Sequence, residues 1–246
     1  MINDYKHLID NYKENLFNFT KYSFFESAYR IFGILIFPIM KYLNPNIISI
    51  SSLSMSIIAF SISIISNSIA LSYIILFFVF SFILDFTDGM VARFHKKSSF
   101  NGRFIDGLFD IIVFGLLHII LFETVVQKEI SFFYSYFYLV TILIYPVQHL
   151  IMDRYSAIAR WINEIQGKKI KQPYYRNSFF GKTTMLLYDI QHLCLWLLLI
   201  NIFNYNLIIE IFFLASFFAS IISILIYLYL SKKNFSSENN ELDNEE

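Results

Sequence analysis

The stretch DFTDGMVARFHKKSSFNGRFIDGLFD, residues 85–110, places four aspartates beside two long apolar segments. Asp85 and Asp88 lie at the end of one segment, and Asp106 and Asp110 lie at the start of the next. Spacings of three and four residues put each pair on one face of a helix. A carboxylate inside a bilayer costs about 2.5–3.5 kcal/mol even on the lenient insertion scale. The four aspartates therefore predict a structure that neutralises their charge.

The apolar segments on either side of this stretch belong to a pattern that covers most of the chain. A helix needs about 20 apolar residues to cross the roughly 30 Å of hydrocarbon in a bilayer. Of the 246 residues, 57% are hydrophobic and 15% are charged, where soluble domains carry about a quarter charged residues. We therefore expect an all-α, polytopic membrane protein with six transmembrane helices. The expected spans are residues 47–66, 69–88, 104–123, 131–152, 184–203 and 207–230.

The segment before the first span mixes aromatic with charged side chains over residues 13–44, and we expect Pro45 to end it. This mixture is typical of a helix that lies in the membrane interface. A seventh short span across residues 31–44 is the alternative. The predicted organisation is an interfacial region over 1–45, a six-helix domain over 46–230 and a polar acidic tail over 231–246. The start of the sequence lacks the pattern of a cleaved signal peptide, so none is expected.

The distribution of basic residues predicts the orientation. All 19 lysines and arginines except Lys128 fall on one side of the six predicted spans. Because basic loops stay in the cytoplasm, we expect both termini and the aspartates on the cytoplasmic side of the cytoplasmic membrane. A net charge of zero gives no basic field for nucleic acid, so no nucleic-acid partner is expected. The single cysteine, Cys194, excludes an internal disulfide and is expected to be an apolar core or lipid-facing residue.

The four aspartates favour a divalent metal site. Two antiparallel helices joined by a short loop over residues 94–102 would turn the two pairs toward a common point. Carboxylates are hard ligands that suit Mg²⁺, Mn²⁺ or Ca²⁺, and four of them can hold two ions. The alternative is a set of salt bridges to Arg93, Lys96 and Arg103, but three cations then face four carboxylates.

Small and polar residues beside the aspartates favour a phosphate ligand. Gly89, Gly102 and Gly107, with Ala92, keep bulky side chains away from the backbone there. Arg93 offers a planar fork to phosphate oxygens, and Ser99 and Asn101 offer further donors. A metal pair, bare backbone and an arginine together predict a pyrophosphate site.

The same stretch resembles the signature of the CDP-alcohol phosphatidyltransferase family, D-x2-D-G-x2-A-R-x8-G-x3-D-x3-D. All eight fixed positions match: Asp85, Asp88, Gly89, Ala92, Arg93, Gly102, Asp106 and Asp110. The resemblance implies an integral membrane enzyme with six transmembrane helices, an N-terminal interfacial helix and a homodimeric state. Its implied activity is transfer of a phosphatidyl group from a CDP-linked lipid donor, CDP-diacylglycerol, to a small polar alcohol in phospholipid biosynthesis, with release of CMP.

The resemblance also implies roles for single residues. Asp85, Asp88 and Asp106 would hold two Mg²⁺ or Mn²⁺ ions, and Asp110 would contact metal and act as the general base. The cytidine and phosphate pocket would be lined by Gly89, Ala92, Arg93, Ser99 and Gly102. Pro45, Asn46 and Ser49 match the family's P-N-x-x-T/S element, so Asn46 and Ser49 are expected at the donor, with a simple helix cap as the alternative for Asn46.

One position departs from relatives that make phosphatidylglycerol phosphate or phosphatidylserine. Those proteins often carry an arginine where this chain has Ser52, which argues against both products. Ser52, Ser56 and Ser63 are expected to form a small-residue packing stripe instead.

The acceptor pocket is the least specified part of the site. Polar groups inside apolar helices often face a cavity, although an interhelical hydrogen bond or an interfacial anchor is an equal alternative for each. The candidates are His149, Asp153, Arg154, Tyr155, Lys182, Asp189 and His192.

Three other functions are compatible with parts of the pattern. A CDP-choline or CDP-ethanolamine phosphotransferase would use the same motif with diacylglycerol as acceptor. An intramembrane prenyltransferase also uses paired aspartates with Mg²⁺, but normally in separated halves of a longer chain. A cation transporter would predict an inverted repeat, and none is visible in the sequence.

Overall fold

The computed structural model is all-helical over the residues that it describes, which are 24–65, 70–96, 100–126, 132–166, 179–200 and 205–235. The all-α class is therefore confirmed. The helices are α2 (Phe24–Met40), α3 (Pro45–Ile65), α4 (Leu71–Phe94), α5 (Phe100–Val126), α6 (Phe132–Gln166), α7 (Phe179–Ile200) and α8 (Tyr205–Phe235).

Six of these helices, α3 to α8, are long and apolar enough to cross a bilayer, which confirms the expected polytopic membrane protein. The spans overlap the predicted ones, but α4 continues to Phe94 instead of ending at 88, and α7 begins at Phe179 instead of 184. The largest difference is in α6, which continues to Gln166 where a polar loop was expected from residue 153. The prediction was wrong there because the polar stretch carries an apolar face. Tyr155, Ala159 and Ile162 are buried at helical spacing, and Tyr155 packs on Tyr227 of α8.

Helix α2 corresponds to the predicted interfacial helix, but it ends at Met40 rather than at Pro45. Pro45 is instead the first residue of α3, where its missing N–H needs no partner. Asn44 caps that helix, because its side-chain oxygen accepts a hydrogen bond of 3.1 Å from the N–H of Asn46. Helix α2 is not among the six described helices that are long and apolar enough to cross a membrane. The predicted residues 13–23 of this helix lie outside the described residues.

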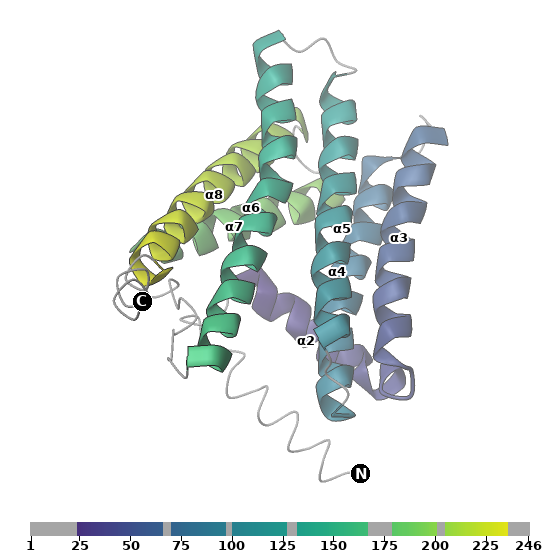
Figure 1. Cartoon of the computed structure of the whole chain (residues 1–246). Helices are drawn as coiled ribbons and strands as arrows, with labels where there is room; N and C mark the ends of the chain where they lie inside the picture. Colours follow the sequence, from purple (N-terminus) through teal and green to yellow (C-terminus); the bar gives the residue numbers. More distant parts are fainter. Residues whose placement is uncertain are drawn as a thin grey trace.

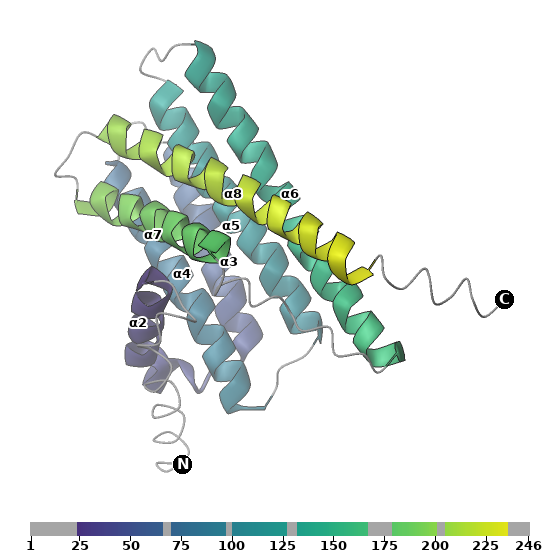
Figure 2. The same cartoon turned by 90° about the vertical axis from the view of Figure 1, so that its left-hand side faces the viewer.

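Helices α3 to α6 run roughly along one axis, and α7 and α8 cross them side by side (Figures 1 and 2). Helix α2 lies across the lower half of this bundle and packs on α4 (Figure 1). The largest core cluster joins all seven described helices, with most of its residues in α4, α5, α7 and α8. It includes Cys194, which confirms the apolar role expected for that residue.

Serine contacts hold α3 against α4. The Ser52 and Ser56 hydroxyls lie 2.9 and 2.8 Å from the Ser81 hydroxyl, and all three side chains are buried. This confirms the packing stripe for Ser52 and Ser56. Ser63 does not join it, because its hydroxyl donates to the Phe60 carbonyl of its own helix.

The connection between α4 and α5 is shorter than predicted. Helix α5 begins at Phe100, so Gly102 lies in its first turn rather than in a loop. The helix starts early because its apolar pattern begins with Phe100 and Phe104, one turn apart. Helices α4 and α5 approach each other at few positions, which leaves room between them beside the aspartates.

Candidate active site

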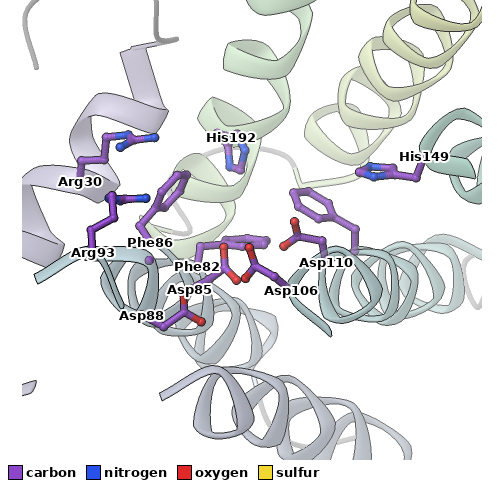
Figure 3. A pocket seen from close by; sticks show the side chains of 12 residues that line it. Arg30, Phe82, Asp85, Phe86, Asp88, Arg93, Asp106, Asp110, His149 and His192 are labelled. Atoms are coloured by element: carbon purple, nitrogen blue, oxygen red, sulfur yellow. The ribbon is translucent and has the colours of Figure 1, made fainter. Parts of the chain in front are cut away.

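A cavity of about 330 Å³ lies at the aspartates of α4 and α5 (Figure 3). Helices α2, α4, α5, α6 and α7 all contribute side chains to its wall. The lining residues are Arg30, Phe82, Asp85, Phe86, Asp88, Gly89, Arg93, Asp106, Asp110, Phe114, His149 and His192.

The carboxylates converge as their spacing predicts. One oxygen each of Asp85, Asp88 and Asp106 lies within 4.8 Å of the other two. Asp110 lines the same cavity one turn further along α5, on the side of His149 (Figure 3). Asp110 is not one of the three carboxylates whose oxygens all lie within 4.8 Å of one another, but it lines the same cavity, so the cavity holds all four.

The cluster of three carboxylates fits a divalent metal ion. Its donors are all hard oxygens, and Mg²⁺ binds such oxygens at about 2.0–2.1 Å, so two ligands of one ion lie up to about 4 Å apart. Separations within 4.8 Å therefore need only small side-chain adjustments, or two ions about 3.5–4 Å apart. Three ionised carboxylates at this distance also repel one another, which a bound cation relieves.

Helix α3 braces the cluster through Ser49. The Ser49 hydroxyl donates a hydrogen bond to the carboxylate of Asp88, which is only 5% exposed. The Pro45 carbonyl lies 3.2 Å from the same hydroxyl oxygen. Ser49, predicted at the donor, therefore acts on the cavity through an aspartate and does not itself line it.

The predicted phosphate-binding residues divide into two groups. Gly89 and Arg93 both line the cavity, and a Cβ atom on Gly89 would lie 3.4 Å from Nη1 of Arg93, so the arginine folds over bare backbone. Ala92, Gly102 and Asn46 lie outside the lining, and Asn46 is exposed at the start of α3. Ser99 lies outside the described residues.

Among the acceptor candidates, His149 and His192 line the cavity. Asp153 is exposed one turn beyond His149, and its Oδ2 would lie 3.8 Å from a Cβ atom on Gly107 of α5. Arg154 and Lys182 are exposed and lie outside the lining.

The other two candidates make interhelical hydrogen bonds, the alternative that the sequence left open. The Asp189 carboxylate accepts hydrogen bonds from the α2 N–H groups of Phe24 and Phe25 at 3.1 and 3.0 Å. The Tyr155 hydroxyl accepts a hydrogen bond of 2.7 Å from Asn234 of α8.

Four lining residues were not predicted from the sequence: Arg30, Phe82, Phe86 and Phe114. The phenylalanines are ordinary members of apolar helices, and nothing in the sequence distinguishes them. Arg30 carries a weak signal, since it shares a helix face with the buried Gly33 and Phe37. An arginine on the buried face of a helix often has a polar destination.

Comparison with known proteins agrees with this geometry. The family described as CDP-alcohol phosphatidyltransferase matches residues 42–225, which is more than half of the chain. The chain therefore belongs to the CDP-alcohol phosphatidyltransferase family. It is an enzyme of phospholipid biosynthesis, a membrane transferase that uses a CDP-alcohol as phosphatidyl donor. Searches of curated proteins and of solved structures gave no match.

Proposed function

We propose that this cavity is the active centre and transfers a phosphatidyl group from CDP-diacylglycerol to the hydroxyl of a small polar alcohol. The observation that carries the proposal is the cluster of Asp85, Asp88 and Asp106, with oxygens within 4.8 Å of one another. The same cavity also holds Arg93 and Asp110. A metal site, a phosphate ligand and a separate carboxylate are the parts that this reaction requires.

Asp85, Asp88 and Asp106 would hold two Mg²⁺ or Mn²⁺ ions, and Asp110, which lines the same cavity, would also contact metal. When bound, the ions neutralise the charge of the donor's diphosphate and of the departing CMP. Arg93 binds phosphate oxygens through its planar guanidinium, and Gly89 lets the diphosphate approach the α4 backbone.

Asp110 acts as the general base. Its carboxylate accepts the proton of the acceptor hydroxyl, which must lie within about 3 Å of it. The acceptor oxygen forms a bond to the phosphorus that carries diacylglycerol. The bond from this phosphorus to the CMP oxygen breaks, and CMP leaves.

The acceptor lies on the α6 side of the cavity in this proposal, because His149 lines the wall beside Asp110 (Figure 3). His149 is therefore the first candidate to contact the alcohol. Asp153 follows one turn along the same helix, and Arg154 and Lys182 stay predictions for a charged part of the acceptor.

Offering the two donor classes separately tests the direction of transfer. Purified protein in detergent receives radiolabelled CDP-diacylglycerol or CDP-choline with Mg²⁺ or Mn²⁺, and CMP release is measured. We expect release from CDP-diacylglycerol in the presence of a polar alcohol. Release from CDP-choline only, dependent on diacylglycerol, would assign the head-group transferase instead. Mass spectrometry of the lipid product then identifies the alcohol.

We further infer that the cavity and both termini face the cytoplasm, and that the enzyme is a homodimer. Orientation is tested by thiol labelling in intact cells after Cys194→Ser, with single cysteines at Arg160, Lys233 and Lys128. We expect only the cysteine at 128 to react with an impermeant reagent. Labelling of the cysteine at 160 from outside would show that the orientation is the reverse.

The homodimer is tested by crosslinking the protein in membranes. The boundaries at residues 45 and 230, between the interfacial region, the six-helix domain and the polar tail, stay a prediction.

A further inference from the structure

Helix α2 lies directly on the turn of α4 that carries Asp88. A Cβ atom on Gly33 would lie 3.0 Å from Oγ1 of Thr87 and 3.1 Å from Cε of Met90, which is closer than side chains normally pack. Glycine at this position therefore lets the two helices approach where the cavity begins. A helix that merely lay in the membrane interface would not need such a contact.

Two polar contacts fix the other side of α2 to α7. Asp189 accepts hydrogen bonds from the first N–H groups described in α2, those of Phe24 and Phe25. The Tyr29 hydroxyl lies 3.1 Å from Nδ1 of His192, which lines the cavity. Helix α2 is therefore held between α4 and α7 and forms part of the cavity wall.

Arg30 is the α2 residue that lines the cavity. Its Nη2 lies 3.0 Å from Oε1 of Glu26, one turn earlier on the same helix. Its guanidinium carbon lies 5.3 Å from the ring centroid of Phe86, another lining residue. The ion pair and the ring contact together hold the guanidinium at the cavity wall.

The two arginines lie at one side of the cavity, and Asp110 with His149 lies at the other (Figure 3). An attacking oxygen and a leaving oxygen are roughly in line at a transferred phosphoryl group. If the acceptor loses its proton to Asp110, the leaving CMP lies toward the arginines.

We propose that Arg30 is a donor-binding residue, whose guanidinium binds the phosphate of the CMP half of the donor together with Arg93. The inference rests on the proposed function of the cavity and adds α2 to its substrate-binding residues. Glu26 is then a positioning residue that holds the guanidinium through their ion pair. A bidentate guanidinium contact to phosphate has a geometry that an ammonium group does not reproduce.

Binding of radiolabelled CMP with Mn²⁺, by equilibrium dialysis of the full chain in detergent, tests this role. Arg30→Gln is expected to raise the Kd for CMP and the KM for CDP-diacylglycerol about 10- to 100-fold, as for a lost hydrogen bond to a charged group. Arg30→Lys keeps the charge without the fork and should show a smaller increase. The KM for the acceptor should change less than about twofold in both variants, because the acceptor binds at the other side.

Lys41→Gln is the matched control. Lys41 directly follows α2, its ammonium lies 5.0 Å from the Tyr42 ring centroid, and it is outside the cavity lining. Its loss removes one positive charge and should leave CMP binding unchanged. If Arg30→Gln does not fold, Arg30→Lys carries the test.

The outcomes separate the two proposals. A wild-type protein that does not bind CMP with Mn²⁺ would overturn the proposed function itself. A wild type that binds CMP, with both Arg30 variants binding equally well, would overturn only the inference about Arg30. An equal rise of KM for donor and acceptor would also overturn it, since that result indicates general damage to the cavity.

Discussion

The bundle contains two kinds of buried polar clusters, and they differ in whether their side chains can satisfy one another. Between α3 and α4, the Ser52 and Ser56 hydroxyls each lie within hydrogen-bond distance of the Ser81 hydroxyl, which in turn reaches the Ser52 carbonyl, so each donor has an acceptor. At the cavity, Asp85 and Asp106 bring like charges together within 4.8 Å. The serine cluster pairs each donor with an acceptor, whereas the carboxylate cluster gathers like charges that, in the proposed function, divalent cations neutralise.

Two further groups of polar side chains pair in the same way, one joining α5 to α8 and the other joining α6 to α7 and α8. His118 contacts Ser216 at 2.7 Å, and Gln148 contacts Tyr188 and Ser220 at 2.6 and 2.9 Å. These side chains combine donors with acceptors, as the serine cluster does. In this bundle, the like charges of the carboxylates therefore indicate a ligand more strongly than the paired polar groups do.

The largest expected difference between the two kinds of cluster follows metal removal. Exhaustive chelation should reduce CMP release to background, because the carboxylates then lack the ions that bind the diphosphate, and added Mg²⁺ or Mn²⁺ should restore it. The helix content, measured by circular dichroism, should change little because the serine cluster needs no ion. Full turnover after chelation would show that the reaction does not need a metal ion.

Ser49 connects the two kinds of cluster, since it is a serine of α3 whose hydroxyl donates to Asp88. Ser49→Ala should lower the affinity for Mn²⁺ about 10- to 100-fold, the usual effect of losing a partner that orients a metal ligand. The readout is CMP release as a function of Mn²⁺ concentration.

Ser51→Ala is the control for this variant. The exposed Ser51 hydroxyl donates to the Ile47 carbonyl of its own helix at 2.8 Å, so its Mn²⁺ dependence should match the wild type. Indistinguishable curves for Ser49→Ala and Ser51→Ala would show that the contact to Asp88 does not matter for metal binding.

The smallest effect is expected at Ser81. Ser81→Ala removes the hydroxyl that both Ser52 and Ser56 contact, which should destabilise the protein by about 0.6–1.7 kcal/mol, as for hydrogen bonds between membrane helices. The melting temperature in detergent should fall, while KM and kcat should each change less than about twofold. A large rise of the donor KM would mean that the two clusters are not independent.

The aspartate cluster could be predicted from the sequence because it depends on local helical spacing on two neighbouring helices. Asp85 with Asp88 and Asp106 with Asp110 share a helix face whatever the rest of the chain does. The six spans follow from length and composition for the same reason. These features need no knowledge of how distant helices pack.

Arg30 could not be predicted as a cavity residue, because its position depends on where α2 docks. That docking rests on Gly33 against α4 and on Asp189, which is 165 residues from Phe24 in the sequence. The predicted end of α6 was wrong for a related reason. The buried face with Tyr155 becomes visible only once α8 is known to pack on it.

The central claim is that the carboxylates of this cavity divide into metal ligands and a base, and paired variants of Asp110 and Asp88 test it most directly. Single-turnover CMP release and binding of CDP-diacylglycerol are measured for Asp110→Asn and Asp88→Asn. Asp110→Asn should slow the chemical step about 10²- to 10⁴-fold, the usual contribution of a general base, with donor binding within a few-fold of the wild type. Asp88→Asn should weaken donor binding. An Asp110→Asn enzyme that turns over at the wild-type rate would contradict the account.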